Sequence, residues 1–450
     1  MNTVNIADYG ASTEAKNNAS SIQKAIDAAA KIGGTVVVPA GVFQSGSLEL
    51  KPHVGLHLAE NAVLKGSPDL ADYPDTGLVH NEMGPVRGLL HAKDAAGITI
   101  DGTGVIDYNG MGFFDFSRPN NQGFDYSHYS AEQLKQFAAH HDDRPTSMTF
   151  LQGCDDLVIR DVTLTNASNW DVVLTDCDNV KVVNITIKST QRVPNDDGIH
   201  LCGCRQVQIT GCNITTGDDC IAITGITDWV REERDIVIAN CILSSSSSGI
   251  RLGGWRSKIK RVTISNCLIR DAGRGVVMSA CHSGYVKDVT VDGLTFVGRP
   301  RAGAWWGGGE AFYLEAIPSD NEAMKDKPWD RGDRFPNIAN IQLSHLNLRS
   351  NIGIIIVGAK QNITDVMIQD AEITMITSQN RGVLGDEIDL SPVPRKLTVP
   401  KGTCYWLYVE EAANVKVTGV RVHNELTTPL KQIDERQVNA RNLQLEYTIV

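Results

Sequence analysis

The sequence predicts an all-β chain that winds into a parallel β-helix, and three features of the chain predict this fold. A ten-residue pattern of alternating apolar residues recurs from Leu157 to Val415 at a spacing of about 25 residues, which is typical of a solenoid. A second column of short apolar segments lies between these copies. The alternation has a period of two, and no helical period separates the copies, so stacked strands are favoured over strand-helix-strand units.

The N-terminal residues differ from this repeat. Residues 17–34, NNASSIQKAIDAAAKIGG, place Ala and Ile at helical spacing between a polar start and a Gly-Gly end. We expect one amphipathic helix that caps the open end of the solenoid, where unpaired backbone would otherwise be exposed. The predicted organisation is one domain over residues 1–450, with the cap in about 1–50, the solenoid in about 51–425 and a C-terminal tail in about 426–450.

Composition excludes several classes of protein. The 450 residues are 42% hydrophobic and 21% charged, which is enough to build a large core, and the net charge of -11 without a basic run disfavours nucleic acid as a partner. We expect no membrane partner, since no stretch of about 18 uninterrupted apolar residues occurs. The first residues lack a leader pattern, so a cytoplasmic location is expected, with secretion or a periplasmic location as the alternative if a leader was removed. The oligomeric state is left open.

Ten cysteines occur without a CxxC pair, so we expect neither a disulfide scaffold nor a zinc site, and no metal. Six of them keep a fixed offset from the repeat and are predicted to form buried interior stacks. They are Cys154, Cys177, Cys204, Cys212, Cys241 and Cys267.

Alignment of the second strand column predicts two rows of side chains, one above another at about 4.8 Å per coil. The first row contains Trp170, Asp197, Asp219, Ser248, Arg274, Glu310 and Ile352. The second row, three positions further on and pointing outward, contains Val173, His200, Ala222, Arg251, Val277, Tyr313 and Ile355. Charged and polar residues gather on these rows, and the irregular segments 108–147, 299–309, 316–340 and 376–402 are expected to flank them as cleft walls.

Two pairs of carboxylates fall on adjacent coils. Asp196 and Asp197 lie in PNDDGIHL, and Asp218 and Asp219 lie in TGDDCIAI. Carboxylates this close repel one another, so at least one of them should have a raised pKa. An acid and a base at one pH are what glycoside hydrolysis requires. The same residues also suit turns between coils or a cation site, and the spacing leaves these alternatives open.

At these residues the chain resembles the polygalacturonase family, glycoside hydrolase family 28, whose members are right-handed, pectin-lyase-like parallel β-helices. Asn195-Asp196-Asp197 matches the family's Asn-Thr-Asp motif with Asp in the Thr place, and Gly217-Asp218-Asp219 matches its Gly-Asp-Asp motif. The likeness extends over about residues 1–425 and includes GVFQSGSLELKPHVGLHLAENAVLKGSPDLADYP and VTLTNASNWDVVLTDCDNVKVVNITI. It implies a catalytic domain and an inverting mechanism, in which Asp218 is the general acid and Asp197 with Asp219 position and deprotonate water.

Two motifs depart from the family. Ser247-Ser248-Gly249 stands where the family has Gly-His-Gly, and Val277-Met278-Ser279 stands where it has the Arg-Ile-Lys that binds the galacturonate carboxylate. Arg251, which lies one coil before Val277 in the same row, is a candidate substitute. It is suited either to a substrate carboxylate or to the hydroxyls of a neutral sugar.

Further residues are predicted to bind substrate because they continue the two rows or offer an aromatic face on which a sugar can stack. Trp170 is the exception, for which packing is favoured, and Glu315 is a further candidate for lining a subsite. The predicted substrate-binding residues are Asn195, Asp196, His200, Ser248, Arg251, Arg274, Glu310, Tyr313, Trp305, Trp306 and Trp255.

The predicted function is hydrolysis of an O-glycosidic bond in a pectic or related poly- or oligosaccharide by paired aspartates, without a cofactor. Two alternatives are open. One is another β-helix chemistry, a polysaccharide lyase or a glycan or fructan transferase. The other is a non-catalytic carbohydrate-binding β-helix.

Overall fold

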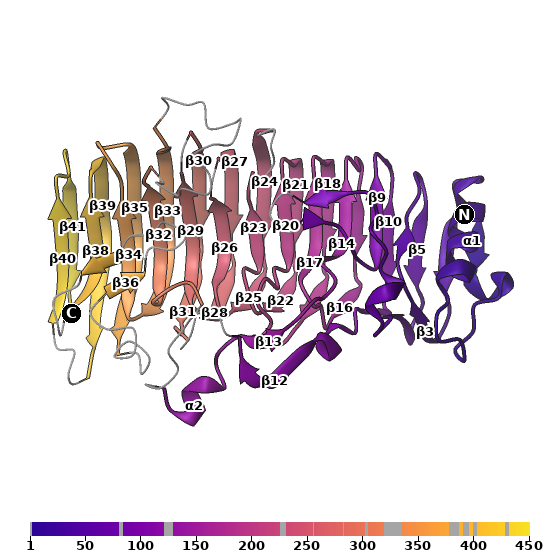
Figure 1. The fold of residues 1–450 in the computed structure, drawn as a ribbon. Coiled ribbons are helices and arrows are strands. Elements are labelled where there is room, and N and C mark those ends of the chain that lie inside the picture. Colours follow the sequence, from indigo (N-terminus) through magenta and orange to yellow (C-terminus); the bar gives the residue numbers. More distant parts are fainter. Residues whose placement is uncertain are drawn as a thin grey trace. The chain divides into compact units, whose positions relative to one another are not determined.

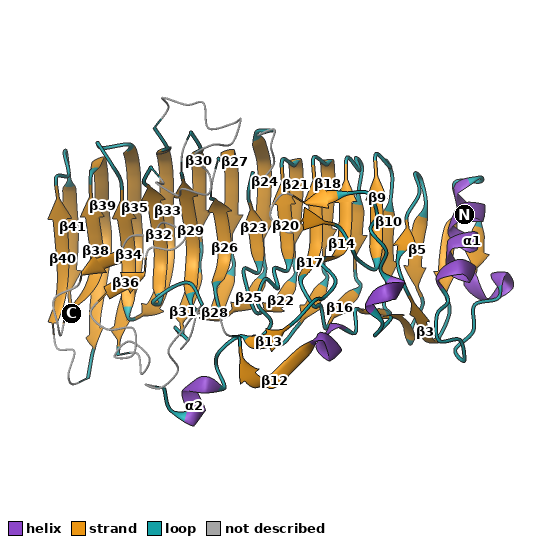
Figure 2. Ribbon diagram, in the orientation of Figure 1, coloured by secondary structure: helices purple, strands orange, loops and turns teal. Residues whose placement is uncertain are grey.

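The computed structural model describes residues 2–80, 84–120, 129–225, 231–254, 256–281, 283–301, 305–318, 335–377, 387–389, 396–398, 403–427 and 432–450. Over these residues the chain is nearly all β, as Figures 1 and 2 show. It divides into two compact units. Unit 1 comprises Met1–Asn120 and Ala139–Asp218, and unit 2 comprises Asn121–Ala138 and Asp219–Val450.

Each unit is a stack of parallel coils, which confirms the predicted parallel β-helix. The expectation that the two units make one domain stays a prediction. No helix in the described part of the chain has the length and apolar character that a membrane span requires.

In unit 1 the predicted N-terminal helix is present as α1 (Ala19–Ala30). Its buried face consists of Ile22, Ala25, Ile26 and Ala29, which recur at helical spacing. Figure 1 shows α1 beside the first coils, and it contacts β1 (Thr3–Asn5), β2 (Thr35–Val38) and β4 (Leu48–Glu49).

The coils of unit 1 contribute strands to two parallel sheets. The first sheet contains β1 and β2, then β3 (Gly41–Ser45), β5 (Gly55–Leu58), β6 (Ala62–Gly66), β10 (Thr99–Gly102), β11 (Val105–Asp107), β15 (Val158–Arg160), β16 (Thr163–Thr165), β18 (Asp178–Val183), β19 (Thr186–Lys188), β21 (Arg205–Thr210) and β22 (Asn213–Thr216). The second sheet contains β4, β9 (Leu90–Lys93), β14 (Ser147–Gln152), β17 (Trp170–Thr175) and β20 (Ile199–Cys202). Outside the coils lie η1 (Ile6–Tyr9), η2 (Leu70–Asp72), η3 (Gly110–Phe113) and two small antiparallel pairs, β7 (Val79–His80) with β8 (Gly84–Pro85) and β12 (Phe114–Pro119) with β13 (Ala139–His141).

Unit 2 repeats this plan. Its first sheet contains β24 (Glu233–Ala239), β25 (Ile242–Ser245), β27 (Lys258–Ser265), β28 (Leu268–Ala272), β30 (Tyr285–Asp292), β31 (Thr295–Gly298), β33 (Asn337–Ser350), β35 (Ile363–Ile376), β39 (Ala412–Glu425) and β41 (Gln444–Ile449). Its second sheet contains β23 (Ile221–Ile223), β26 (Ser248–Gly253), β29 (Arg274–Ala280), β32 (Glu310–Ala316), β34 (Ile352–Val357), β38 (Thr403–Glu410) and β40 (Gln432–Val438). The remaining elements are α2 (Ala131–Leu134), β36 (Glu387–Asp389) and β37 (Lys396–Thr398). Strands β40 and β41 lie in the stretch expected as a C-terminal tail.

Sharp turns within each coil use residues that tolerate the left-handed backbone region. In unit 1 such turns fall at Asp161 (φ 63°), Asn184 (φ 55°) and Gly211 (φ 70°) on successive coils. Asn and Asp adopt this region more readily than other residues with a Cβ, and Gly adopts it without a steric cost. The turns are also linked to one another, since the Asn184 amide donates to Asp161 Oδ1 at 2.9 Å.

The coil interiors are apolar, and all ten cysteines are buried. The backbone N–H of Cys154 donates to Cys177 Sγ at 3.4 Å, so cysteines on successive coils do contact each other. Cys177 also interacts with Cys204 in unit 1, and Cys241 interacts with Cys267 in unit 2. The predicted stacking is confirmed for these cysteines, and the place of Cys212 in its stack stays a prediction.

The predicted rows are confirmed within each unit by strand register. Val173 pairs with His200 between β17 and β20 of unit 1. In unit 2, Arg251 pairs with Val277, which in turn pairs with Tyr313. Period-two alternation fixes which side chains share a face, and for this reason the sequence alone was sufficient to align them.

Candidate active site

In unit 1, Asp197 is held by a buried histidine. His200 Nδ1 and Asp197 Oδ2 are 2.7 Å apart, and the two side chains are only 1% and 5% exposed. The ring of His200 stacks on that of Trp170, with 4.0 Å between the centroids and 20° between the planes. Packing and a hydrogen bond together fix the orientation of the Asp197 carboxyl. The predicted packing role of Trp170 is confirmed.

A second histidine covers this group. His80, from β7, contacts Trp170 edge to face at a centroid distance of 4.4 Å. Burial lowers the pKa of His80 to about 4, so the ring is neutral at ordinary pH. Trp170 also belongs to an apolar cluster with Leu78, Val86, Phe150 and Val173. His80 was not singled out from the sequence because it lies outside the repeat.

The turns that carry the two acidic motifs are hydrogen-bonded to each other within unit 1. The Gly217 N–H donates to Asp196 Oδ2 at 2.9 Å, and the Asp218 N–H donates to the Asp196 carbonyl at 3.3 Å. The Thr216 hydroxyl donates to the Asp218 carbonyl at 2.7 Å. A Cβ at Gly217 would lie 1.9 Å from the Val193 carbonyl oxygen, so this turn requires glycine. The first Asp of the Gly-Asp-Asp motif is therefore fixed against the Asn-Asp-Asp motif.

Arg144 supports the same region and was not predicted. Its guanidinium donates to the carbonyls of Ser168 and Pro194 and to Asn195 Oδ1, the last at 3.2 Å. Burial lowers its pKa to about 10. Asn195 has a positive φ of 54° and its side-chain oxygen is engaged by Arg144, so the structure gives it a turn-forming place. Its predicted sugar contact stays a prediction.

Asp196 and Asp171 form a buried pair of acids. Neither side chain reaches the surface, and burial raises the pKa of Asp196 to about 7. Burial and repulsion by Asp196 raise the pKa of Asp171 well above its ordinary value. Asp171 was missed because it stands alone beside Trp170 without a motif. The expectation of a raised pKa among the clustered carboxylates is met by Asp196.

In unit 2, Asp219 is buried and bonded to two groups from β26. Its Oδ1 accepts from the Ser248 N–H at 3.1 Å, and its Oδ2 lies 3.4 Å from Arg251 Nη1. Arg251 also donates to the Gly253 carbonyl at 3.1 Å, and its Cζ lies 5.1 Å from the centroid of the Trp306 ring. Arg251 is thus the cation beside the second Asp of the Gly-Asp-Asp motif.

Arg274 and Glu310 form a second buried pair in unit 2. Arg274 Nε lies 3.3 Å from Glu310 Oε2, and the side chains are 1% and 0% exposed. The Gly308 N–H donates to the same carboxylate oxygen at 2.8 Å. Arg274 Cζ lies 4.5 Å from the centroid of the Tyr313 ring. These contacts bind the three predicted sugar ligands to one another, and their contact with substrate stays a prediction.

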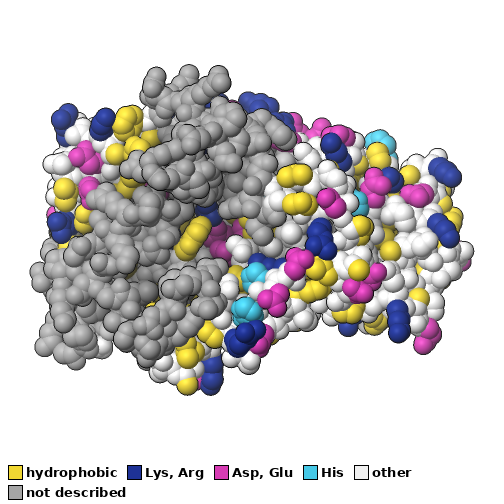
Figure 3. Space-filling view, in the orientation of Figure 1, with side chains coloured by type: hydrophobic (Ala, Val, Ile, Leu, Met, Phe, Trp, Pro, Cys, Tyr) yellow, Lys and Arg dark blue, Asp and Glu magenta, His cyan; other side chains and the backbone are white. Residues whose placement is uncertain are grey.

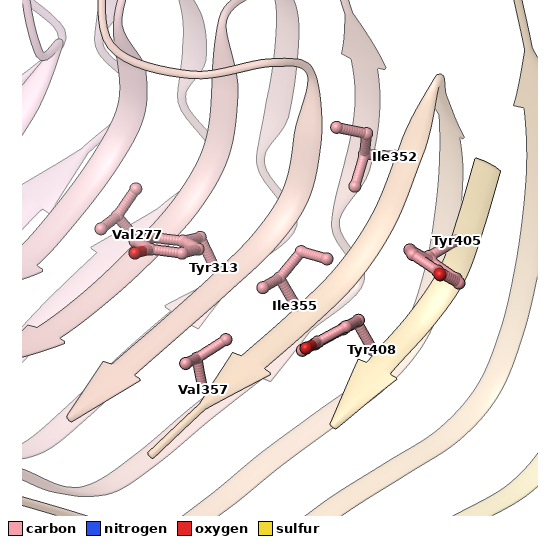
Figure 4. Close-up of a cluster of buried hydrophobic side chains, with 7 residues drawn as sticks. All are labelled: Val277, Tyr313, Ile352, Ile355, Val357, Tyr405 and Tyr408. Atoms are coloured by element: carbon pink, nitrogen blue, oxygen red, sulfur yellow. The ribbon is translucent and has the colours of Figure 1, made fainter. Parts of the chain in front are cut away.

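Tyr313 connects this pair to Glu315. Its hydroxyl donates to Glu315, and the Ser279 hydroxyl donates to Glu315 Oε1 at 3.2 Å. Burial raises the pKa of Glu315 to about 7. Figure 4 shows the Tyr313 ring within an apolar cluster from successive coils, beside Val277 and Ile355. Tyr313 therefore bridges an apolar row and a polar one.

The three tryptophans predicted as sugar platforms differ in their placement. Trp305 is 7% exposed and its indole N–H donates to the Gln136 carbonyl at 2.8 Å, so it packs against the residues that follow α2 in unit 2. Trp306 is partly exposed under the Arg251 guanidinium. Trp255 lies outside the described residues. The stacking roles stay predictions.

The described residues contain no group of three or more His, Cys, Asp or Glu side chains placed to hold a metal. Figure 3 shows acidic and basic side chains interspersed over the coloured part of the visible face. Ion pairs at the surface of unit 1 include Arg87 with Asp143, at 3.2 Å.

By fold the chain is a parallel β-helix, and unit 1 joins two acidic turns by hydrogen bonds. A family model for glycosyl hydrolases family 28 matches residues 30–297, more than half of the chain, and the chain therefore belongs to that family.

Curated relatives carry pectinase names. The chain is 33% identical over 249 residues to an exo-poly-alpha-D-galacturonosidase of Dickeya chrysanthemi, a match that covers 48% of this chain and 41% of that protein. It is 27% identical over 323 residues to a probable polygalacturonase of Vitis vinifera, covering 68% of this chain and 62% of that protein. The matches thus span about half the length of these relatives.

Solved structures share the fold. A family 28 exopolygalacturonase of Yersinia enterocolitica matches with a TM-score of 0.69 at 17% identity, covering 97% of this chain and 78% of that one. A hyperthermoactive exopolygalacturonase of Thermotoga maritima matches with a TM-score of 0.63 at 21% identity, covering 83% of this chain and 87% of that one. At these identities the likeness concerns the fold.

Proposed function

We propose that this protein hydrolyses an O-glycosidic bond in a pectic poly- or oligosaccharide. Membership of glycosyl hydrolases family 28 and the polygalacturonase names of its relatives support this substrate class. The observation that carries the proposal is the contact between the two acidic turns of unit 1, where the Asp218 N–H donates to the Asp196 carbonyl beside Asp197.

The proposed hydrolysis requires one protonated and one ionised carboxyl group. Asp218 is the general acid that protonates the leaving oxygen, and Asp197, with Asp219, is the base that takes a proton from the attacking water. The bond between Asp197 and His200 at 2.7 Å supports the role of Asp197, because it fixes the orientation of the carboxylate that takes the proton from water. We propose inversion at the sugar carbon, for which the acid and base carboxyls stand about 6.5–9.5 Å apart so that water fits between them.

Arg251, which lies 3.4 Å from Asp219 in unit 2, is the proposed contact for a sugar of the substrate. Its planar guanidinium can bind a carboxylate with two parallel bonds or bind a pair of hydroxyls. The Trp306 ring 5.1 Å from its Cζ supports this role, because an aromatic face beside a guanidinium suits a sugar ring.

The test is a screen of wild type and Asp218→Asn on galacturonan, rhamnogalacturonan, fructan and neutral glycan oligosaccharides. Reducing ends and ultraviolet absorbance are both read, because a lyase product carries a new double bond. Wild type should release reducing ends from a pectic substrate without absorbance, and Asp218→Asn should lose at least about 10²-fold in kcat. The matched control is Asp161→Asn at an exposed left-handed turn, where Asn fits equally well. Release by Asp218→Asn at the wild-type rate would refute the assignment of the acid.

A further inference from the structure

Asp196 holds the turn of the general acid at two points. Its carboxylate accepts the Gly217 N–H at 2.9 Å, and its carbonyl accepts the Asp218 N–H at 3.3 Å. Gly217 cannot move toward Val193, since even a Cβ would lie 1.9 Å from the Val193 carbonyl oxygen. The backbone at Gly217 and Asp218 is thus held by the hydrogen bonds to Asp196 and by the close approach to Val193.

The side chain of Asp196 is fully buried, and its predicted contact with a sugar stays a prediction. The charged and titratable groups that act on the two acids are Arg144 on Asp196, and Asp171 and Asp196 on each other, with Tyr108 beside Asp171. Burial raises the pKa of Tyr108, so its phenol is neutral.

The pair is short of hydrogen-bond donors if both carboxyls are ionised. Both oxygens of Asp171 and Oδ1 of Asp196 are buried and, among the described residues, have no partner of ordinary hydrogen-bond geometry, although the Ser189 hydroxyl lies close enough to Asp196 to lower its pKa. In the described part of the chain one cation, Arg144, acts on the pair, so two buried negative charges would be only half compensated. A proton held between the two carboxyls removes one charge and supplies one donor.

We propose that Asp196 is a positioning residue for the general acid Asp218, and that Asp171 shares a proton with it and thereby keeps the Asp196 carboxyl turned toward Gly217. The role of Asp218 rests on the proposed function, whereas the hold on the turn does not. Burial raises the pKa of both carboxyls, which fits a shared proton.

The kinetic test compares Asp196→Ala with Asp196→Asn. The alanine removes the acceptor for the Gly217 N–H, and we expect kcat to fall at least tenfold with KM within threefold of wild type. The asparagine supplies an amide oxygen in the same place and should restore kcat to within about threefold. Asp161→Asn, with its exposed side chain, is the control. A rise in KM with unchanged kcat in Asp196→Ala would instead make Asp196 a sugar ligand and overturn the proposal.

Amide hydrogen exchange tests the hold on the turn without any substrate. In Asp196→Ala the amides of Gly217 and Asp218 should exchange at least tenfold faster than in wild type, while amides of β5 stay protected. Asp196→Asn should keep the Gly217 and Asp218 amides protected from exchange. In Asp171→Asn these amides should stay protected up to a higher pH than in wild type. Unchanged exchange at Gly217 in Asp196→Ala would refute the positioning role.

The two failures are distinguishable. If wild type releases no product from any pectic substrate while exchange at Gly217 still depends on Asp196, the proposed function fails and the hold on the turn stands. If product is released but exchange and kcat are indifferent to Asp196, the positioning role fails alone.

Discussion

The two units place acids in their interiors by different means. In unit 1, Asp171 and Asp196 are buried together, and among the described residues one cation, Arg144, acts on them, so a proton would balance the charge. In unit 2 two of the buried acids have a cation as partner, Arg251 for Asp219 and Arg274 for Glu310, whereas Glu315 accepts from the neutral hydroxyls of Tyr313 and Ser279. The comparison teaches that a buried acid can be compensated by a fixed cation, by neutral donors or by a proton.

Removal of a cation from unit 2 is the largest expected perturbation. Arg274→Ala leaves Glu310 buried without its ion partner and should lower the free energy of unfolding by about 3–5 kcal/mol. Arg261→Ala is the control, because it breaks an exposed pair with Asp235 at 2.6 Å and should change stability little. Urea unfolding measures both. Equal losses in the two variants would mean that burial of the pair does not matter.

The second-largest effect is expected at Gly217, whose turn fixes the backbone of Asp218 in unit 1. Gly217→Ala forces a methyl group against the Val193 carbonyl and should cost about 1–3 kcal/mol, with a loss of turnover from the displacement of Asp218. Gly112→Ala, where a Cβ meets nothing within 4 Å, is the matched control. Thermal unfolding and kcat are measured on the same samples. A wild-type kcat in Gly217→Ala would contradict the claim that this turn fixes the position of Asp218.

The proton in unit 1 predicts a pH dependence of stability. The folded-state pKa of Asp171 is raised, so the folded protein retains a proton that the unfolded chain loses above about pH 4. Stability therefore falls as pH rises from about 4 until Asp171 titrates in the folded state, by about 1.4 kcal/mol per pH unit. Asp171→Asn removes this contribution.

Thermal unfolding from pH 4 to 8 measures this effect. Asp171→Asn should unfold at a higher temperature than wild type at pH 7, and the difference should vanish near pH 4. Parallel curves for the two proteins would show that Asp171 titrates normally. Asp161→Asn, at an exposed side chain, should follow wild type throughout.

The smallest effect is expected at Tyr313 in unit 2, whose neutral hydroxyl donates to Glu315. Tyr313→Phe removes the hydroxyl that donates to Glu315 and should cost about 1–2 kcal/mol, because a buried acceptor loses a partner. Differential scanning calorimetry checks the stability, and KM on the pectic substrate checks the predicted sugar contact. A larger change in KM than in stability would show that Tyr313 serves the substrate.

The strands and rows were predictable because alternation with a period of two dictates which side chains share a face. His200 and Arg251 were found in this way. Arg144 was not found, since it lies in a segment without a period, and Asp171 was not found, since its importance comes from a partner 25 residues away that only the coil brings close. Burial of Arg274 and Glu310 depends on which loops cover the row, and loop conformation leaves no periodic signal.

The ten buried cysteines can report local opening of the coils. Cys154, Cys177, Cys202, Cys204 and Cys212 belong to unit 1, and Cys220, Cys241, Cys267, Cys281 and Cys404 belong to unit 2. A thiol-reactive dye reaches a cysteine only when its coil separates from a neighbour. The order in which the ten sites label therefore reads out, coil by coil, where the solenoid first loosens.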